Sequence, residues 1–442
     1  MYFNIKVIFI NHLYFIMSTI IPKKEKKEKE IDFNNTEYIA FKFMYIGKNY
    51  DGLVIQSTTK NTIEEILFSS LKKCKFLDPT KNNDELISTS NYSRCGRTDK
   101  GVNSSGNVFA LNLRYNPKYD YVKTLNSILP DDIFIISSCI VDDSFDARFS
   151  CLYREYKYYF LKKNMNIQKM QQAASLLSGI HNFKNFCKID KSDENWEEKN
   201  YVRRIFEIKI EKICENEFIY PFDIDKNCIN NEYYQAYVCI IKGSAFLWHQ
   251  VRCIMQILFL IGDELEDIEL IEEMFNENSK YEFKYGLADD SNLILSDCVF
   301  EFINFSNNES CIKNNNNCDL YYKLEKIYLA NLMQCIINTH FFNIIFKNNF
   351  GSYFNDNNDK DSNSYKNIFK TVNESRRKYK YTKLLQVKTN REKDKKNEIK
   401  KADKAEKADK TYKKEKTNKK EKTDKKDKAN KIDKNDKQIK KK

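Results

Sequence analysis

The chain has 442 residues, of which 41% are apolar, enough for one large domain or two ordinary ones with a hydrophobic core. The net charge of +12 lies entirely in residues 391–442, which hold 24 Lys and Arg against 12 Asp and Glu, so the rest of the chain is electrically balanced. A globally basic surface is therefore excluded, and any nucleic-acid site must come from a local arrangement of charge.

Residues 1–36 are expected to be an N-terminal extension and a charged linker. Residues 1–21 are apolar but interrupted by Asn, Lys and His, and they lack the basic start of a signal peptide. They also fall short of a clean membrane span, so we expect no membrane partner. We expect the protein in the nucleus, the cytoplasm or both, and leave organellar targeting open.

Residues 37–145 alternate between strand and helix patterns. Apolar residues at every second position predict a first strand, and they are Ile39, Phe41, Phe43 and Tyr45. Thr62-Ile63-Glu64-Glu65 is a capping-box pattern that opens a helix, and the polar residues 80–92 indicate a loop. The elements that complete this unit are a strand at 109–115, a short helix near 121–128 and a strand near 133–140.

Residues 146–303 show a second mixed pattern of strands and helices. The expected strands lie near 153–162, 201–213 and 233–242, and the expected helices near 166–178 and 247–262. The last helix has apolar residues at helical spacing, which predicts one buried face. Two α+β halves joined near residue 145 are the simplest account of the chain.

The C-terminal third divides into two parts. Residues 304–350 are expected to form an Asn-rich loop and then a helix, at about 320–347, that packs on the domain. The apolar residues at helical spacing are Tyr321, Leu324, Tyr328 and Leu332. Residues 351–442 are expected to be a Lys-rich disordered tail, because 391–442 have almost no apolar residues to offset the entropy of ordering.

The cysteines and histidines do not suggest a metal site. The chain has 13 Cys, scattered singly between Cys74 and Cys335 without a CxxC pair, and only 4 His. This distribution argues against a zinc site and against a disulfide framework. We interpret the cysteines as reduced thiols of an intracellular protein, and we expect neither a metal nor a cofactor.

The segment with the clearest chemical pattern is residues 93–111, SRCGRTDKGVNSSGNVFAL. Asp99 stands between Arg97 and Lys100 in a loop that contains several glycines, which allow the backbone to approach a ligand closely. An ordinary turn leading into a strand is the alternative. A phosphate loop is excluded, because Val102-Asn103 stand where Lys and Ser or Thr are required.

This segment resembles the GRTDxGV signature of the TruA family of tRNA pseudouridine synthases. Further motifs in the order of that family are Tyr45-Ile46-Gly47, Leu129-Pro130-Asp131-Asp132-Ile133, Phe145-Asp146-Ala147-Arg148-Phe149-Ser150, Arg154-x-Tyr156-x-Tyr158, His181-Asn182-Phe183 and Gly243-Ser244-Ala245-Phe246-Leu247-x-His249-Gln250-Val251-Arg252. The resemblance covers about residues 37–303. Details of three motifs are most similar to the eukaryotic branch that acts on uridines 38 and 39 of the anticodon arm.

The resemblance implies an α+β fold of two related halves, whose antiparallel sheets are joined around a central RNA-binding cleft. It implies an isomerase that converts uridine to pseudouridine in tRNA without a cofactor, and a homodimer. Isomerisation needs a carboxylate beside the sugar or base, and a base inside a folded RNA must be flipped out. The sequence departs from the family pattern at 103–107 and 53–55, which bears on fine substrate contacts and not on the chemistry.

The resemblance also assigns roles to six residues. Asp99 is the nucleophile, Arg252 pairs with it, and Arg97 fills the space left by the flipped base. Tyr156 stacks on that base, and period-two alternation places Arg154, Tyr156, Tyr158 and Phe160 on one face of a strand. The remaining substrate contacts are assigned to Arg154 and Lys100.

Three of these residues have an alternative interpretation. In it, Tyr156 is part of the packed core, Arg252 is an exposed helix residue, and Arg97 contacts a phosphate. For the whole protein, the alternatives are an RNA-binding protein without catalysis and a scaffold whose Lys-rich tail is the functional part.

Overall fold

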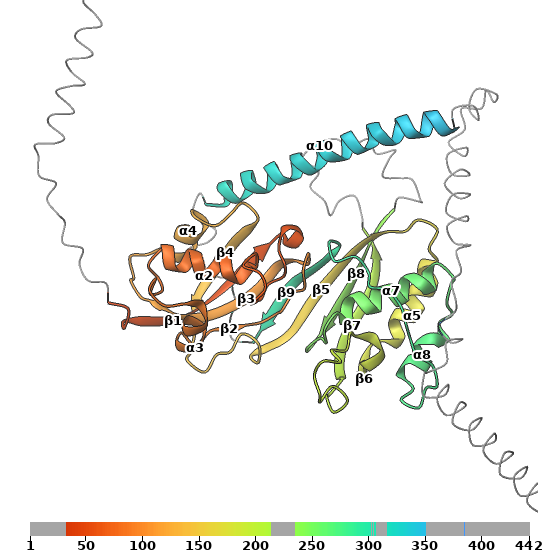
Figure 1. Ribbon diagram of the computed structural model, residues 1–442, viewed down its shortest axis with the longest axis horizontal. Helices are drawn as coiled ribbons and strands as arrows, with labels where there is room; N and C mark the ends of the chain where they lie inside the picture. Colours follow the sequence, from red (N-terminus) through yellow and green to blue (C-terminus); the bar gives the residue numbers. More distant parts are fainter. Residues whose placement is uncertain are drawn as a thin grey trace, which may run out of the picture.

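The computed structural model describes residues 32–213, 235–301, 303, 305, 316–350 and 384, and Figure 1 shows their arrangement. The described strands form one sheet in the order β4-β1-β3-β9-β5-β8-β7-β6, with β2 paired to β3. In chain order they are β1 (Thr36–Tyr45), β2 (Ser93–Arg94), β3 (Asn103–Arg114), β4 (Ile133–Ile140), β5 (Cys151–Leu161), β6 (Gly179–Asn182), β7 (Val202–Lys212), β8 (Ala236–Gly243) and β9 (Leu293–Phe300).

Helices pack on each half of this sheet and bury a separate core there. The helical elements are η1 (Gly47–Asn49), α2 (Ile63–Lys73), α3 (Asn83–Thr89), α4 (Tyr121–Asn126), α5 (Ile167–Leu176), η2 (Lys184–Phe186), α7 (Gln250–Gly262), α8 (Glu269–Phe275) and α10 (Asn316–Phe350). One core joins α2, α3 and α4 to β1 and β3. The other joins α5, α7 and α8 to β5, β7, β8 and β9. The predicted α+β fold of two halves is confirmed.

The two halves meet through one parallel strand pair. Asn103 and Ser104 of β3 pair with Ile294 and Leu295 of β9 in parallel, whereas β9 runs antiparallel to β5. The remaining pairs of described strands are antiparallel. The sheets predicted for the two halves are thus one continuous sheet, and a strand from the end of the second half joins it to the first.

The residues at 103–105 that depart from the family pattern hold this joint. Asn103 Oδ1 accepts a hydrogen bond from Gly47 N at 3.0 Å, and its Nδ2 donates to the carbonyl oxygens of Ser291 at 2.9 Å and Leu293 at 3.3 Å. Ser104 Oγ donates to Leu295 O at 2.9 Å. These side chains therefore link the first half to β9 and to the residue Ser291 just before it.

We expect Asn103→Ala to lower the free energy of unfolding by about 1–3 kcal/mol, because backbone groups at the joint lose their partner. Urea denaturation checks this, with Asn112→Ala as the matched control on the same strand. The structure gives the Asn112 side chain no hydrogen bond within the described part of the chain. Equal stability of the two variants would show that Asn103 does not support the joint.

Residues 80–92 are not a simple loop, so that prediction was wrong. Asn82 Oδ1 accepts from Glu85 N at 2.9 Å, and Glu85 Oε2 accepts from Asn82 N at 3.0 Å, which caps α3. Of this seven-residue helix, Leu86 is the buried residue. So short and polar a helix leaves little apolar periodicity in the sequence.

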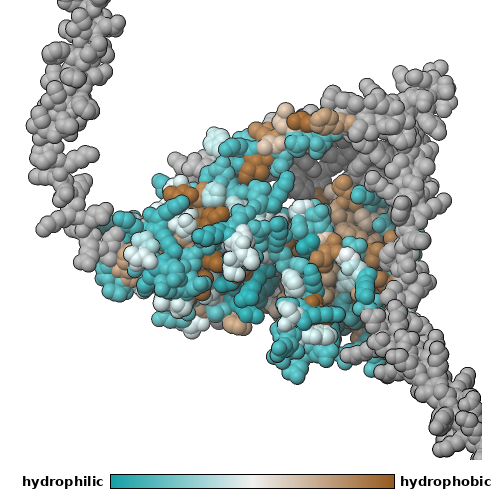
Figure 2. All heavy atoms as spheres, viewed as in Figure 1, coloured by the Kyte–Doolittle hydropathy of each residue, from teal (hydrophilic) through white to brown (hydrophobic). Residues whose placement is uncertain are grey.

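The helix predicted at 320–347 exists and is longer; of its four apolar residues at helical spacing, Leu324, Tyr328 and Leu332 are half-buried and Tyr321 is exposed. Within the residues of α10 whose side chains are described, none is buried. Lys323 and Lys326 form ion pairs with Asp131 at 3.6 and 3.0 Å. Exposed apolar side chains follow along the helix at the top of Figure 2, and they are Leu329, Met333, Ile337 and Phe341. Polar contacts at one end therefore attach α10 to the first half.

The predicted extension at 1–36 and tail at 351–442 lie largely outside the described residues. Of the tail, Leu384 is described: it is buried in the core of the second half, and its N–H donates to Glu266 Oε1 at 2.7 Å. In the described part of the chain, no helix is long and apolar enough to cross a membrane.

Candidate active site

The loop that carries Asp99 runs between β2 and β3 and is held on both sides. Asn107, fully buried on β3, accepts a hydrogen bond from Gly96 N and donates to Gly96 O, both at 3.0 Å. The hydroxyls of Tyr45 and Thr98 are 2.6 Å apart, and Leu53 N donates to Thr98 O. Buried neighbours thus fix the residues before Asp99 in place.

Gly101 lets this loop turn back sharply after Asp99. Its φ is +79°, a left-handed conformation that favours glycine. An added Cβ at Gly101 would lie 2.5 Å from Asp290 Oδ1, so Asp290 of the second half lies against the loop. The glycine predicted to allow close approach therefore does so against the protein's own second half.

Asp99 lies at the contact between the two halves, with a side chain that is 26% exposed. Its Oδ2 is 3.4 Å from Nε2 of His249, which precedes α7. Burial raises the pKa of Asp99 to about 6, against the lowering effects of the Arg252 charge, hydrogen bonding from Trp248 and the Lys188 charge. The nearby Asp290 also raises it. Asp99 is thus a carboxyl group that burial makes harder to ionise.

This pKa predicts a pH dependence for any reaction in which Asp99 acts as a carboxylate. The group is protonated below its pKa, so the single-turnover rate should fall about tenfold per pH unit below about 6 and level off above it. The effect of Asp99 on stability has the opposite pH dependence. Its folded-state pKa exceeds the ordinary value of 3.8, so the protonated group favours folding at low pH. This contribution to stability is lost as pH rises towards 6. A pH–rate profile with circular dichroism as the folding control checks this, and a rate that stays constant down to pH 5 would contradict it.

Arg252, in the first turn of α7, is close to Asp99 but does not pair with it as expected. Its Nε donates to Ala288 O at 2.7 Å, and its Nη2 is 3.3 Å from Asp290 Oδ2. Of the charges around Asp99, that of Arg252 has the largest effect in favouring ionisation. The side chain is only 12% exposed, so the alternative of an exposed helix arginine is wrong.

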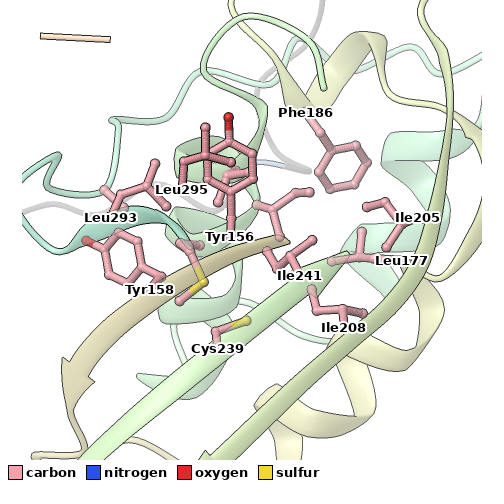
Figure 3. Packing of buried hydrophobic residues seen from close by; sticks show 14 of the residues in the cluster. Tyr156, Tyr158, Leu177, Phe186, Ile205, Ile208, Cys239, Ile241, Leu293 and Leu295 are labelled. Atoms are coloured by element: carbon pink, nitrogen blue, oxygen red, sulfur yellow. The ribbon is translucent and has the colours of Figure 1, made fainter. Parts of the chain in front are cut away.

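Tyr156 lies on β5 among the buried residues of the second half. Arg154, Tyr156, Tyr158 and Phe160 are all buried, which confirms the predicted face of the strand. The ring of Tyr156 packs edge-to-face on Phe246 at 5.0 Å, and Figure 3 shows it beside Leu295. Burial and then nearby charges, including that of Asp99, raise the pKa of Tyr156. Tyr156 is therefore part of the core of the second half, and the charge of Asp99 acts on its hydroxyl.

Arg154 has a different task from the substrate contact predicted for it. It is 7% exposed, and its guanidinium donates to three carbonyl oxygens, those of Ser244 at 2.6 Å, Cys95 at 3.2 Å and Arg148 at 2.5 Å. These carbonyls belong to the Asp99 loop, to the turn before β5 and to the turn after β8. The geometry favours a positioning role, in which one buried cation joins three loops around the site.

Arg97 and Lys100 flank Asp99 and are both exposed. Arg97 has no ion pair within the described residues, and burial together with the charges of Arg94 and Arg148 lowers its pKa. Lys100 forms an ion pair with Asp51 at 2.8 Å. Arg97 is thus a cation available for an anionic partner, whereas a substrate contact by Lys100 has to compete with Asp51.

The structure adds His249, Trp248, Lys188 and Asp290 to the predicted site. His249 has a left-handed φ of 60°, its Nδ1 is buried without a hydrogen-bond partner, and burial lowers its pKa to about 4. His249 lies in the sequence motif that ends in Val251-Arg252, and this position could have indicated a site residue. Nothing in the sequence assigned it a role. In the described part of the chain, no group of His, Cys, Asp or Glu could hold a metal ion.

Comparison with known proteins places this chain in a family. Residues 173–301 match the family model described as tRNA pseudouridine synthase. A protein of Methanosphaera stadtmanae named tRNA pseudouridine synthase A is 32% identical over 277 residues, which cover 61% of this chain and 87% of that protein. The chain belongs to the tRNA pseudouridine synthase family.

Other members of the tRNA pseudouridine synthase family are more similar but longer. The Saccharomyces cerevisiae protein named tRNA pseudouridine(38/39) synthase is 39% identical over 297 residues, covering 63% of this chain and 61% of its own length. The Homo sapiens protein of that name is 35% identical over 303 residues, covering 63% and 58%. The chain thus spans about three fifths of the length of these relatives.

Proposed function

We propose that this protein is a tRNA pseudouridine synthase that isomerises uridines 38 and 39 in the anticodon arm, with Asp99 as the nucleophile. The observation that carries the proposal is the place of Asp99. A loop of the first half presents this carboxyl group to His249 and Arg252 of the second half, and burial raises its pKa to about 6. Two relatives named for positions 38 and 39 support the choice of nucleotides.

The proposed reaction is an isomerisation, so the nucleotide gains and loses no atoms overall. The bond between the sugar and N1 of uracil breaks, a bond between the sugar and C5 forms, and the proton of C5 is lost while N1 gains one. Ionised Asp99 attacks the base or the sugar carbon and is released unchanged. Arg252 favours the ionised carboxylate, as its effect on the pKa of Asp99 indicates.

The target base has to leave the RNA stack to reach Asp99. Flipping costs a few kcal/mol, and stacking on one aromatic ring returns about 1–3 kcal/mol. In the proposal, Tyr156 provides that ring and Arg97 enters the space left in the RNA. The exposed position of Arg97 in the Asp99 loop, with no ion pair in the described residues, supports this role.

A homodimer, and a location in the nucleus or the cytoplasm, belong to the same proposal. Both rest on the family resemblance. Light scattering of the purified full-length protein measures the oligomeric state directly.

The experiment that tests the function uses the full-length protein and a tRNA transcript with uridine at positions 38 and 39. Pseudouridine mapping is expected to show conversion at these positions and not at cytidine placed there. Binding without conversion would favour an RNA-binding protein that does not catalyse.

Deletion of residues 391–442 tests the tail, and full activity of the shortened protein would reject the tail as the functional part.

A further inference from the structure

Trp248 is an exposed aromatic residue at the active site to which the proposed reaction gives no role. Trp248 is 47% exposed, whereas Tyr156 is 9% exposed. It stands directly before His249, whose left-handed φ of 60° turns the chain into α7. An exposed ring alone is common on protein surfaces, so its surroundings decide what it means.

Lys188 lies over this ring. Lys188 Nζ is 5.1 Å from the centroid of Trp248, and Lys188 N donates to Trp248 O at 3.0 Å. Lys188 is exposed, and no carboxylate lies within ion-pair distance of it in the described part of the chain. The segment after η2 thus supplies a cation above an exposed indole, a pair suited to one nucleotide with its base and its phosphate.

This pair lies directly beside the nucleophile. The imidazole of His249, which is 3.4 Å from Asp99, lies against the ring of Trp248 with 4.8 Å between the ring centroids. The Trp248 side chain and the charge of Lys188 both help to hold down the pKa of Asp99. A nucleotide on Trp248 would therefore be a direct neighbour of the nucleotide that reacts at Asp99.

We propose that Trp248 and Lys188 form a binding platform for the nucleotide next to the target uridine. When the target flips out, its neighbour in the RNA loses a stacking partner. The indole replaces that partner, and the ammonium of Lys188 pairs with the adjoining phosphate. The inference rests on the proposed function and names a second nucleotide position within its site.

The sequence offers a direct probe, because the chain has only two tryptophans. Trp196→Phe leaves Trp248 as the sole indole, and the replaced ring contacts Lys184 and Lys191 rather than the site. The full-length variant is titrated with an anticodon stem-loop RNA while tryptophan fluorescence and filter binding are recorded. Quenching that saturates with binding supports the platform, and unchanged fluorescence with clear binding overturns it.

Substitutions then separate stacking from charge. Trp248→Ala should weaken RNA binding about 5- to 100-fold, and Trp248→Phe should restore most of the loss because the ring is kept. Lys188→Gln should lower the slope of log affinity against log salt by about 0.7, as expected for one phosphate contact. Trp248→Ala that binds like the parent would overturn the inference.

Measuring pseudouridine formation by the Trp196→Phe protein distinguishes a failure of the platform proposal from a failure of the proposed function. If this protein converts uridine while Trp248→Ala binds RNA normally, the platform is wrong and the proposed function stands. If the parent protein neither binds the RNA nor forms pseudouridine, the proposed function fails and the platform fails with it.

Discussion

Asp99→Asn is expected to lower the rate of pseudouridine formation by at least about 10³-fold, because the amide cannot act as a nucleophile. The side chains keep nearly the same shape, so tRNA affinity should stay within about threefold of the parent protein. Single-turnover conversion of a tRNA transcript measures the first quantity, and filter binding measures the second.

The control for this change is Asp142→Asn, an exposed carboxylate after β4 whose Oδ1 accepts hydrogen bonds from Ser144 that an asparagine Oδ1 can also accept. The two variants should also differ in stability. Burial raises the pKa of Asp99 to about 6, so its charge opposes folding at pH 7, and its removal should raise the melting temperature. An Asp99→Asn protein that converts uridine at the parent rate would refute the role of Asp99 as the nucleophile.

Arg154→Met is expected to lower the free energy of unfolding by about 3–5 kcal/mol, because buried carbonyl oxygens that lose a hydrogen-bond donor cost about 1–3 kcal/mol each. Three carbonyl oxygens, of Cys95, Arg148 and Ser244, lose their donor. The loop before Asp99 loses a support at the same time, so conversion should fall at least about 100-fold even where the protein is folded. Urea denaturation and single-turnover rates, both at low temperature, measure the two effects.

Arg114→Met serves as the matched control, because Arg114 donates through one nitrogen to one carbonyl, Lys75 O at 2.7 Å, far from the site along β3. A second variant, Arg154→Lys, keeps the charge but cannot reach all three carbonyls at once. If Arg154→Met is as stable and active as the Arg114 variant, then Arg154 does not organise the loops.

The sequence predicted the parts of the site that depend on local pattern. Alternation along β5 placed Arg154 and Tyr156 on one buried face. Glycines around Asp99 indicated a tight loop, and Gly101 has the left-handed φ that such a loop needs. Family resemblance then assigned roles to Asp99, Arg97 and Arg252.

What the sequence did not predict depends on contacts between distant segments. Asp290, which pairs with Arg252, follows it by 38 positions in a stretch without regular structure. The three carbonyl partners of Arg154 are backbone atoms, which carry no signal in side-chain identity. α3 was missed because its stability comes from caps at Asn82 and Glu85 rather than from an apolar face.

The place of β9 has a consequence for synthesis of the chain. This strand is the last of the described sheet to leave the ribosome, yet it lies between β3 and β5 in the middle of that sheet. Until residue 293 has emerged, both neighbouring strands expose an unpaired edge, which is a template for aggregation. Nascent chains that stop short of β9 should therefore be insoluble and inactive, although they already contain Asp99, Tyr156 and Arg252.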